Sequence, residues 1–567
     1  MNPSRYQLPQ YVSEDRQRAR AATLRLERAR FAWKRDTPPE PLLTEMRPLP
    51  PWCAQMPTEV KFPSAKITVF SADKLTTVVN TALVSLSSLL IPLNSVNGYR
   101  AMFRLVRGPH ASMDRWEDDA DFGRQRLTGV NPMQLKLLRD DERTPLWQAG
   151  ERVLAQRSKL TMQEAFFQRR LFVTDYSLLA HPRVQQHVRA GASLAAPTCL
   201  FWTDDYGALM PLAIQLRPRG FQGPNPVLTP LSPRHDWMLA RAHAQAADTH
   251  MHEGIYHLLE THLISEAVAM AMYRRLHPDH PLRQLLEPHF EYNLAIDDLA
   301  RGGLVAPGGT IDTAVAGGVS GIFDAMRLYY QDWNYLDRSL ERDLHARGVD
   351  DPTTLPRYYY REDGRALHDA IANYTTAILR LWYRHDGDVE ADHELQAFVH
   401  EASSAEGSAI PGFPTQIHSF AQLTELATEM IFRAGPQHAA VNNGQFDAYG
   451  WIPNTPAVVM GDLPTMEPTP QTAMTAKQFW QAMPPRNCAL AQLGMVWILS
   501  RPTERTILHS GESPAFHPSL CYEADEIIGG FRRRLQSISD DIQRRNDTLD
   551  LPYRYMDPLN VSRSTDI

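Results

Sequence analysis

His250-Met-His252-Glu-Gly-Ile-Tyr-His257-Leu-Leu-Glu-Thr-His262-Leu-Ile-Ser-Glu266 places three imidazoles at intervals of five residues among long apolar side chains. The segment has no proline, and its one glycine lies near its start, so the pattern predicts a buried helix that carries metal ligands. Five residues turn an ideal α-helix by about 500°, which leaves successive imidazoles about 140° apart. We therefore predict a local π-type widening of the turn, a feature that is frequent at functional sites.

Two other interpretations of this segment are a set of ordinary histidines and a zinc-protease site. Any single histidine in it is compatible with an ordinary core or surface position. A zinc-protease site is excluded, because His252-Glu253 begins a His-Glu-x-x-His motif but Tyr256 stands where the second histidine is required. The regular triple favours a metal site, provided that further ligands are found elsewhere in the chain.

The composition is that of a folded globular protein with a sizeable core. The 567 residues are 43% hydrophobic and 22% charged, with a formal net charge of -7. This acidic balance gives no electrostatic footprint for nucleic acid, so we expect no nucleic-acid partner. The four cysteines are too few and too widely spaced for a disulfide framework, which favours a reducing compartment.

The N-terminal region combines a basic segment with a proline-rich one. Residues 1–36 lack an apolar core followed by a cleavage site, so we predict no signal peptide and expect a cytoplasmic location. Their arginine and lysine residues alternate with apolar ones, which fits either a membrane-surface helix or a solvated helix packed on the main domain. Residues 38–63 are proline-dense and predicted to be extended. We therefore predict an N-terminal extension, 1–75, packed on one large domain, 76–567.

The most apolar window is Thr76–Val96. Asparagine, serine and proline residues interrupt it, so it falls short of the continuous apolar run that a membrane-spanning helix needs. We predict no transmembrane segment. The window is expected to form a buried helix, or part of a mobile cover over a lipid cavity.

Helical periodicity dominates the rest of the chain, which indicates a mainly α fold with a small β-sheet region. Alternating β-favouring residues predict strands at 170–176, 198–202 and 209–216. Helices are predicted at 237–275, at 323–383 with a turn at 360–364, and at 420–432.

Two further candidate ligands follow the last of these helices. His438 and Asn442 are four residues apart, about 40° around a helix, so their side chains point the same way. Pro436 suits the first turn of a helix, and Gly444 offers a flexible exit. Taken alone, the pair is a weak signal, and a structural role is the alternative.

Together, the three evenly spaced histidines and the later His438-x3-Asn442-x2-Gln445 closely resemble the signature segments of the lipoxygenases, the non-haem iron dioxygenases of polyunsaturated fatty acids. The resemblance implies one lipoxygenase-type helical domain around two long iron-bearing helices. It extends, in order, over Trp116–Pro132, Pro211–Leu216, Trp237–Leu276, Ala300–Asp312, Tyr360–Ile371, the Asn454-Thr-Pro456 turn and the terminal Ile567.

The resemblance implies one non-haem iron per chain, with manganese as the alternative ion. Its five ligands would be His257, His262, His438, Asn442 and the main-chain carboxylate of Ile567. This mixed nitrogen and oxygen set, with a position left for water, suits non-haem iron more than structural zinc.

Three further residues would lie behind these ligands and orient them: His252, Glu253 and Gln445. Many family members carry an amide at the place of Glu253.

The activity that the resemblance implies is the dioxygenation of a polyunsaturated fatty acid of the linoleate or arachidonate class. Ferric iron bearing hydroxide takes a hydrogen atom from the bis-allylic carbon, and O2 adds to the far end of the radical to give a hydroperoxide. A fatty acid hydroperoxide isomerase on the same scaffold is the first alternative. A non-catalytic lipid-binding protein is the second, and the complete ligand set argues against it.

Five residues fall where lipoxygenases place the substrate pocket. Ala300 stands at the position where the family has alanine for S hydroperoxides and glycine for R, which predicts an S product. Leu304 matches the leucine that packs on the reacting pentadiene, although it also fits an ordinary core position. Small residues at Thr249, Ala314 and Val315 predict a cavity deep enough for a C18 or C20 chain.

The segment before the helical domain departs from animal and plant lipoxygenases. Roughly seventy residues rich in arginine and proline are too short for the N-terminal β-sandwich that docks those proteins on membranes. The pattern is therefore of the bacterial type. We expect a monomer whose partners are a polyunsaturated fatty acid and O2, with peripheral membrane contact as a further option.

Overall fold

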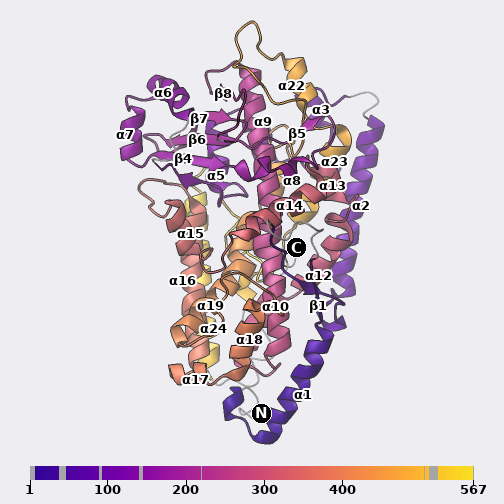
Figure 1. Cartoon of the computed structure of the whole chain (residues 1–567), viewed down its shortest axis with the longest axis vertical. Helices are drawn as coiled ribbons and strands as arrows, with labels where there is room; N and C mark the ends of the chain where they lie inside the picture. Colours follow the sequence, from indigo (N-terminus) through magenta and orange to yellow (C-terminus); the bar gives the residue numbers. More distant parts are fainter. Residues whose placement is uncertain are drawn as a thin grey trace.

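The computed structural model describes residues 7–36, 46–87, 92–139, 145–218, 220–503, 505–509 and 522–565. Within them, helices make up most of the molecule, and the strands form one small sheet and two strand pairs (Figure 1). The predicted mainly α fold with a small sheet region is confirmed.

One continuous helix runs through the middle of the molecule (Figure 1). It consists of α9 (Arg234–Met251), the π-helix η6 (His252–Leu263) and α10 (Ile264–Arg275). From Trp237 to Tyr273 every residue except Leu258 is buried. This explains the lack of a polar face in the sequence, because other elements cover the helix on all sides. The predicted π-type widening is confirmed and extends over the whole histidine triple.

A second helix approaches η6 from the C-terminal half of the chain. It consists of α19 (Phe420–Phe432), the π-turn η9 (Arg433–Gln437) and α20 (His438–Asn442). The prediction that Pro436 begins a helix is wrong, because the proline lies inside this continuous one. A proline cannot donate a backbone hydrogen bond, and a π-turn is one place where such a gap in the ladder is accommodated.

The small sheet has the strand order β3-β4-β6-β7-β8, and every neighbouring pair is antiparallel. The three predicted strands are confirmed as its centre. A register shift between Leu200 and Phe201 faces Pro211 in β7, where the ladder lacks a donor. The strands are β3 (Lys136–Leu137), β4 (Leu171–Asp175), β6 (Thr198–Thr203), β7 (Leu209–Gln215) and β8 (Val227–Leu228).

The remaining elements pack around this frame. Those that bear on the site are α12 (Asn293–Leu299), the π-turn η8 (Ala300–Leu304), α13 (Thr310–Ala314), α14 (Gly318–Gln331) and α16 (Tyr359–Arg380). The other helices are α3 (Val96–Arg100), α4 (His110–Arg115), α5 (Asp119–Thr128), α6 (Leu146–Arg157), α7 (Met162–Phe167), α8 (Pro182–Gln185), α11 (Pro281–Leu286), α15 (Leu340–Arg347), α17 (Asp386–Glu390), α18 (His393–Ser403), α21 (Gln445–Tyr449), α22 (Ala476–Ala482), α23 (Arg486–Leu499) and α24 (Tyr522–Asn546). Short 3-10 turns are η1 (Pro9–Tyr11), η3 (Thr58–Val60), η5 (Ser177–Ala180), η7 (Glu287–Phe290) and η10 (Ile507–His509), and the two strand pairs are β1 (Trp33–Lys34) with β2 (Trp52–Cys53) and β5 (Ala192–Ser193) with β9 (Val459–Met460).

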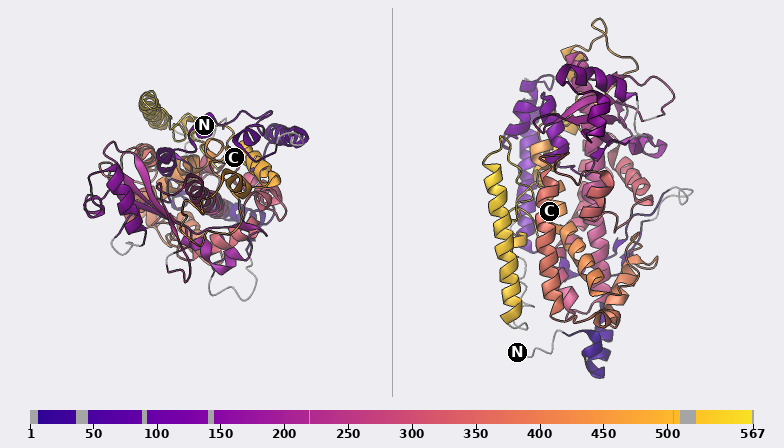
Figure 2. Two further views of the ribbon diagram at one scale, coloured as in Figure 1. Left: turned by 90° about the horizontal axis from the view of Figure 1, so that it is seen from above. Right: turned by 90° about the vertical axis from the view of Figure 1, so that its left-hand side faces the viewer.

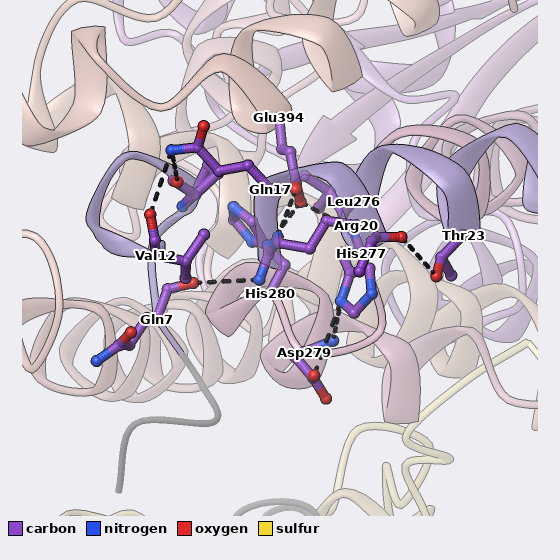
Figure 3. Close-up of polar contacts among 12 residues, drawn as sticks. Gln7, Val12, Gln17, Arg20, Thr23, Leu276, His277, Asp279, His280 and Glu394 are labelled. Atoms are coloured by element: carbon purple, nitrogen blue, oxygen red, sulfur yellow. Dashed lines mark hydrogen bonds and ion pairs between the residues drawn. The ribbon is translucent and has the colours of Figure 1, made fainter. Parts of the chain in front are cut away.

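The basic N-terminal segment forms α1 (Glu14–Arg30), which packs against α10. Arg20 is buried and donates to both carboxylate oxygens of Glu394, at 2.7 and 2.8 Å (Figure 3). Beyond the helix, Phe31 stacks on Tyr273 with ring centroids 4.6 Å apart. Of the two interpretations of this segment, these contacts favour a helix packed on the main domain.

Two other expectations need correction. Helix α16 runs through 360–364, where a turn was predicted, so Gly364 sits within a helix. In the window 76–96, α2 (Ser64–Ser87) is mostly exposed and lies along the edge of the molecule (Figures 1 and 2). The alternative of a buried helix is therefore wrong, and that of a cover over a lipid cavity stays a prediction. Residues 88–91 of this window, and 37–45 in the proline-dense region, lie outside the described residues. Helix α2 passes through position 75, so the chain has no break in secondary structure there. The division into 1–75 and 76–567 stays a prediction.

Candidate metal centre

Three histidines from the two central helices converge in the interior. Ligand atoms of His257, His262 and His438 all lie within 4.8 Å of one another, and all three residues are buried. It is the one such cluster of His, Cys, Asp and Glu in the part of the chain that the structure describes. Two helices far apart in sequence thus bring three imidazoles to one point.

The π-helix is what aligns the histidines of the first helix. With hydrogen bonds from i to i+5, residues five apart stand above one another rather than about 140° apart. The rings of His252 and His257 are stacked, with centroids 5.7 Å apart and planes 20° apart. The rings of His257 and His262 are 5.0 Å apart and meet edge to face. The local geometry therefore produces the convergence that the spacing demanded.

Two properties of these histidines suit metal binding: their protonation state and a ring nitrogen that lacks a hydrogen-bond partner. Burial lowers the pKa of His257 to about 4, and burial and the neighbouring imidazoles hold the pKa of His438 well below its usual value. Both are therefore neutral at pH 7, which is the form that binds metals. The Nε2 atom of His257 is buried and has no hydrogen-bond partner among the described residues. A buried polar atom without a partner is costly, and a metal ion would satisfy it.

The residues expected behind the ligands lie where they can orient them. Gln445 Nε2 donates to Asn442 Oδ1 at 2.8 Å, and both side chains are buried. His252 Nε2 lies 2.7 Å from the carbonyl oxygen of Val441, which ties η6 to the helix that carries Asn442. One oxygen of Glu253 lies 3.5 Å from His257 Nδ1. Burial raises the pKa of Glu253, but contacts with His252 and His257 outweigh it and bring that pKa to about 2.

His262 is held by a carboxylate that sequence reasoning missed. Its Nδ1 lies 2.8 Å from Oδ1 of Asp297 in α12, which leaves Nε2 directed toward His438 at 3.1 Å. Burial raises the pKa of Asp297 and of the neighbouring Glu266 to about 7, and Arg301 offsets part of the rise in both. A hydrogen bond between the two carboxyl groups further raises the pKa of Glu266 and lowers that of Asp297. The 2.8 Å distance makes Asp297 the acceptor of a hydrogen bond from His262 Nδ1–H.

The end of the described chain is bound by the segment just before Asp297. His289 Nδ1 lies 3.0 Å from the carbonyl oxygen of Arg563, and Glu291 forms an ion pair with the same arginine. Ser564 Oγ donates to the carbonyl oxygen of Glu291 at 2.8 Å.

The next residue of the chain end, Thr565, is also bound: Asn293 Nδ2 donates to its Oγ1 at 2.6 Å. We refer to residues 289–293 as the tail clamp. Tyr292 within it has the left-handed backbone conformation, with φ 64°, which is uncommon for a residue other than glycine. Ile567, the expected fifth ligand, lies outside the described residues. The last described residue, Thr565, lies two positions before Ile567 in the sequence. Its partner Asn293 also donates to the carbonyl oxygen of His262, at 3.4 Å.

The predicted pocket residues lie on elements that contact one another. Ala300 and Leu304 begin and end η8 and are half-buried. Ala314 and Val315, at the end of α13, are fully buried. Helix α13 contacts both η8 and α14, and α14 contacts α9, in which Thr249 is buried. Their role as the lining of a fatty acid cavity stays a prediction.

Comparison with known proteins gives a consistent result. Residues 100–558 match the lipoxygenase family. The chain is 31% identical over 542 residues to an allene oxide synthase-lipoxygenase protein of Plexaura homomalla, covering 90% of this chain and 50% of that protein. It is 34% identical over 470 residues to a hydroperoxide isomerase of Rattus norvegicus, covering 80% and 63%. It thus spans about half to two thirds of the length of these curated relatives.

A solved structure agrees over nearly the whole chain. The anaerobic crystal structure of a lipoxygenase variant in complex with arachidonate superimposes with a TM-score of 0.89 at 28% identity, covering 99% of this chain and 83% of that one. The family match takes in both central helices and the tail clamp. This chain therefore belongs to the lipoxygenase family.

Proposed function

We propose that this protein is a lipoxygenase that adds O2 to a polyunsaturated fatty acid of the linoleate or arachidonate class. The observation that carries the proposal is the buried cluster of His257, His262 and His438. The imidazoles of His257 and His438 are neutral at pH 7, and Nε2 of His257 has no hydrogen-bond partner among the described residues. Asn442 and the carboxylate of Ile567 would complete a site for one iron, with manganese as the alternative. Iron held there supplies the one-electron chemistry that removes a hydrogen atom from a bis-allylic carbon.

The protein's own residues would prepare and protect this chemistry. Asp297 fixes the tautomer of His262, so that Nε2 is the atom left to bind the metal. Glu253 and Gln445 restrain His257 and Asn442 in the same way. The buried surroundings exclude water, so a carbon radical formed there would meet O2 rather than solvent. The overall change is the insertion of O2 between carbon and hydrogen to give a hydroperoxide.

The finer assignment of the product rests on the pocket residues. Ala300 places a methyl group near the expected position of the pentadiene, which favours O2 addition on the S face. Leu304 would press on the reacting carbons. Thr249, Ala314 and Val315 leave room for a C18 or C20 chain. The arachidonate bound in the related crystal structure supports a fatty acid of this length.

A hydroperoxide isomerase is the second candidate. It is favoured by one observation, the 34% identity to a rat hydroperoxide isomerase over 80% of this chain. Such an enzyme would rearrange a fatty acid hydroperoxide instead of forming one. The two reactions use the same metal site, so the products must distinguish them.

We further propose the setting in which the enzyme works. Residues 76–567 form the catalytic domain, and residues 1–75 are an extension held by α1. The protein acts as a cytoplasmic monomer that makes peripheral contact with membranes. None of the helices in the described part of the chain combines the length and the low polarity needed to cross a bilayer.

The decisive experiment uses purified protein whose iron content has been measured. It is mixed with linoleate under O2 while oxygen uptake and conjugated-diene absorbance are followed, and the product is resolved by chiral chromatography. Oxygen uptake with diene formation and an S hydroperoxide supports the proposal. Conversion of added hydroperoxide without oxygen uptake identifies the isomerase. Neither reaction at full iron occupancy identifies a lipid-binding protein.

A pair of variants makes the test specific to the metal site. His262→Ala should lose both iron and oxygen uptake, whereas His345→Ala, which changes an exposed histidine, should keep both.

A further inference from the structure

Helix α2 buries two polar side chains against the protein and turns several aliphatic side chains toward solvent. Among its described side chains, the buried ones are Asp73, Asn80 and Val84. Their spacing of seven and four residues places them on one face of the helix. A helix that packs on a globular core normally shows the opposite arrangement, with the apolar face buried.

The buried face is anchored by specific polar contacts. Asp73 lies 3.2 Å from the guanidinium group of Arg501, just beyond α23. Asn80 Nδ2 donates to the carbonyl oxygen of Met102 at 3.1 Å. Its Oδ1 accepts from the backbone nitrogens of Arg104 and Leu105, at 3.1 and 3.0 Å. These contacts fix the rotation of α2 about its axis, so the aliphatic side chains face outward.

The outward face is a continuous aliphatic stripe. Leu75, Val78, Val79 and Leu83 follow the i, i+3, i+4, i+8 pattern and are 62%, 57%, 39% and 40% exposed. Ile67 continues it toward the N-terminal end and is 52% exposed. An exposed apolar surface of this regularity marks an interaction site.

The charges on α2 indicate which partner fits. The helix carries three charged residues, Lys66, Asp73 and Lys74. Asp73 faces inward, and Lys66 is half-buried over the ring of Tyr292, so Lys74 is the exposed charge of the helix, in a chain whose net charge is -7. Anionic lipid headgroups attract such a lysine, whereas a second copy of the same face would bring Lys74 close to its own counterpart.

The position of α2 links this face to the metal centre. Phe62, just before α2, lies 5.4 Å from the ring of Tyr292 in the tail clamp, and Lys66 lies over the same ring at 4.8 Å. Tyr292 caps α12, the helix that carries Asp297 and leads to Ala300. At the end of α12, Leu299 is also exposed, by 52%.

We propose that the outward face of α2 is the surface by which this protein docks on a lipid bilayer. The aliphatic stripe would enter the boundary between headgroups and acyl chains, with Lys74 at headgroup level. This inference builds on the proposed function, because a fatty acid partitions into membranes and would be taken up beside the docked face. It assigns membrane contact to α2 and not to the basic helix α1, whose Arg20 is buried against Glu394.

The test is flotation of the full-length protein with vesicles of phosphatidylcholine, with and without phosphatidylglycerol. The variant Leu75→Gln/Val79→Gln replaces two outward side chains with good helix formers. We expect vesicle binding to fall more than about tenfold, because the variant loses the favourable free energy of transferring two aliphatic side chains from water into the bilayer. The matched control is Phe167→Gln/Tyr206→Gln, which removes two side chains that are 73% and 85% exposed elsewhere, and it should bind as the natural protein does.

A second variant tests the charge. Lys74→Glu should weaken binding to vesicles that contain phosphatidylglycerol and leave binding to pure phosphatidylcholine nearly unchanged. Turnover of dispersed linoleate is measured for every variant. Flotation without turnover would support docking while rejecting lipoxygenase activity.

Three outcomes would overturn the proposal. The first is a natural protein that does not float with either vesicle. The second is a Leu75→Gln/Val79→Gln variant that floats equally well. The third is a lipid-free dimer, seen by analytical ultracentrifugation, that this variant dissociates, because the partner of α2 would then be a second copy of the chain.

Discussion

Asn293 donates a 2.6 Å hydrogen bond to Thr565 across 272 residues of sequence, and neither side chain is exposed to solvent. The same amide lies 3.2 Å from Oδ2 of Asp297, whose other oxygen holds His262. The last described residue and a histidine of the buried cluster therefore share one hydrogen-bonded group. This connection ties the position of the chain end to the position of His262.

Replacing Asn293 should release the chain end. Asn293→Ala leaves the buried Thr565 hydroxyl without its partner, at a cost of about 1–3 kcal/mol. We expect the metal-free variant to lose its C-terminal residues to carboxypeptidase faster than the natural protein, and the holoenzyme to retain less iron. Asn225→Ala is the control, because the hydrogen bonds of the Asn225 side chain both go to the backbone of Arg217 in its own loop. Equal digestion of both variants would show that the clamp does not hold the tail.

Asp297 should govern how firmly the metal is held. In Asp297→Asn the neutral amide no longer provides a charged acceptor for His262 Nδ1. Loss of such a partner typically costs about 10–100-fold in metal affinity. The measurement is the rate of iron release to a chelator, followed by absorbance. Asp298→Asn changes the exposed neighbour and should release iron at the natural rate. If both variants behave alike, the carboxylate contributes nothing specific.

Ala300 should control the stereochemistry of the product. Removing its methyl group in Ala300→Gly opens the other face of the pentadiene to O2. We expect a marked rise in the R fraction of the hydroperoxides, read by chiral chromatography, with iron content unchanged. Ala295→Gly, on the buried side of α12, is the control for loss of a helical methyl group and should keep the S product. An unaltered S:R ratio in Ala300→Gly would remove this residue from the site.

His243 should make the protein sensitive to acid. Burial lowers its pKa from 6.5 to about 3, so between these values the unfolded chain takes up a proton that the native chain cannot. This contribution to stability is therefore complete above pH 6.5 and is lost as the pH falls toward 3. From pH 6.5 to 5 the loss is about 2 kcal/mol.

The check is the pH dependence of urea unfolding for the metal-free protein. His243→Gln should lose less stability on acidification than the natural protein, by about this amount. Replacement of the exposed His345 should leave the pH dependence unchanged. A parallel pH dependence in natural protein and His243→Gln would show that this histidine is not held neutral.

The sequence predicted features that depend on local spacing. Three histidines five residues apart required a π-helix if they were to meet, and η6 provides it. The strands at 171–175, 198–203 and 209–215 followed from short β-favouring runs. Local spacing was misleading at Pro436 and at 360–364, where packing carries one helix through residues that favour a break. The free energy of local conformational preference is small compared with the free energy gained by packing a long helix into a large core.

What the sequence by itself determined is the set of residues able to bind a metal, because ligand type and helical period are properties of neighbouring positions. What only the tertiary structure decided is which distant groups serve them. Asp297 meets His262 across 35 residues, and Asn293 meets Thr565 across 272. The rotation of α2, which turns its aliphatic stripe outward, likewise depends on Asp73 and Asn80 finding partners on other elements. Periodicity specifies the faces of a helix, but only packing in three dimensions specifies what each face meets.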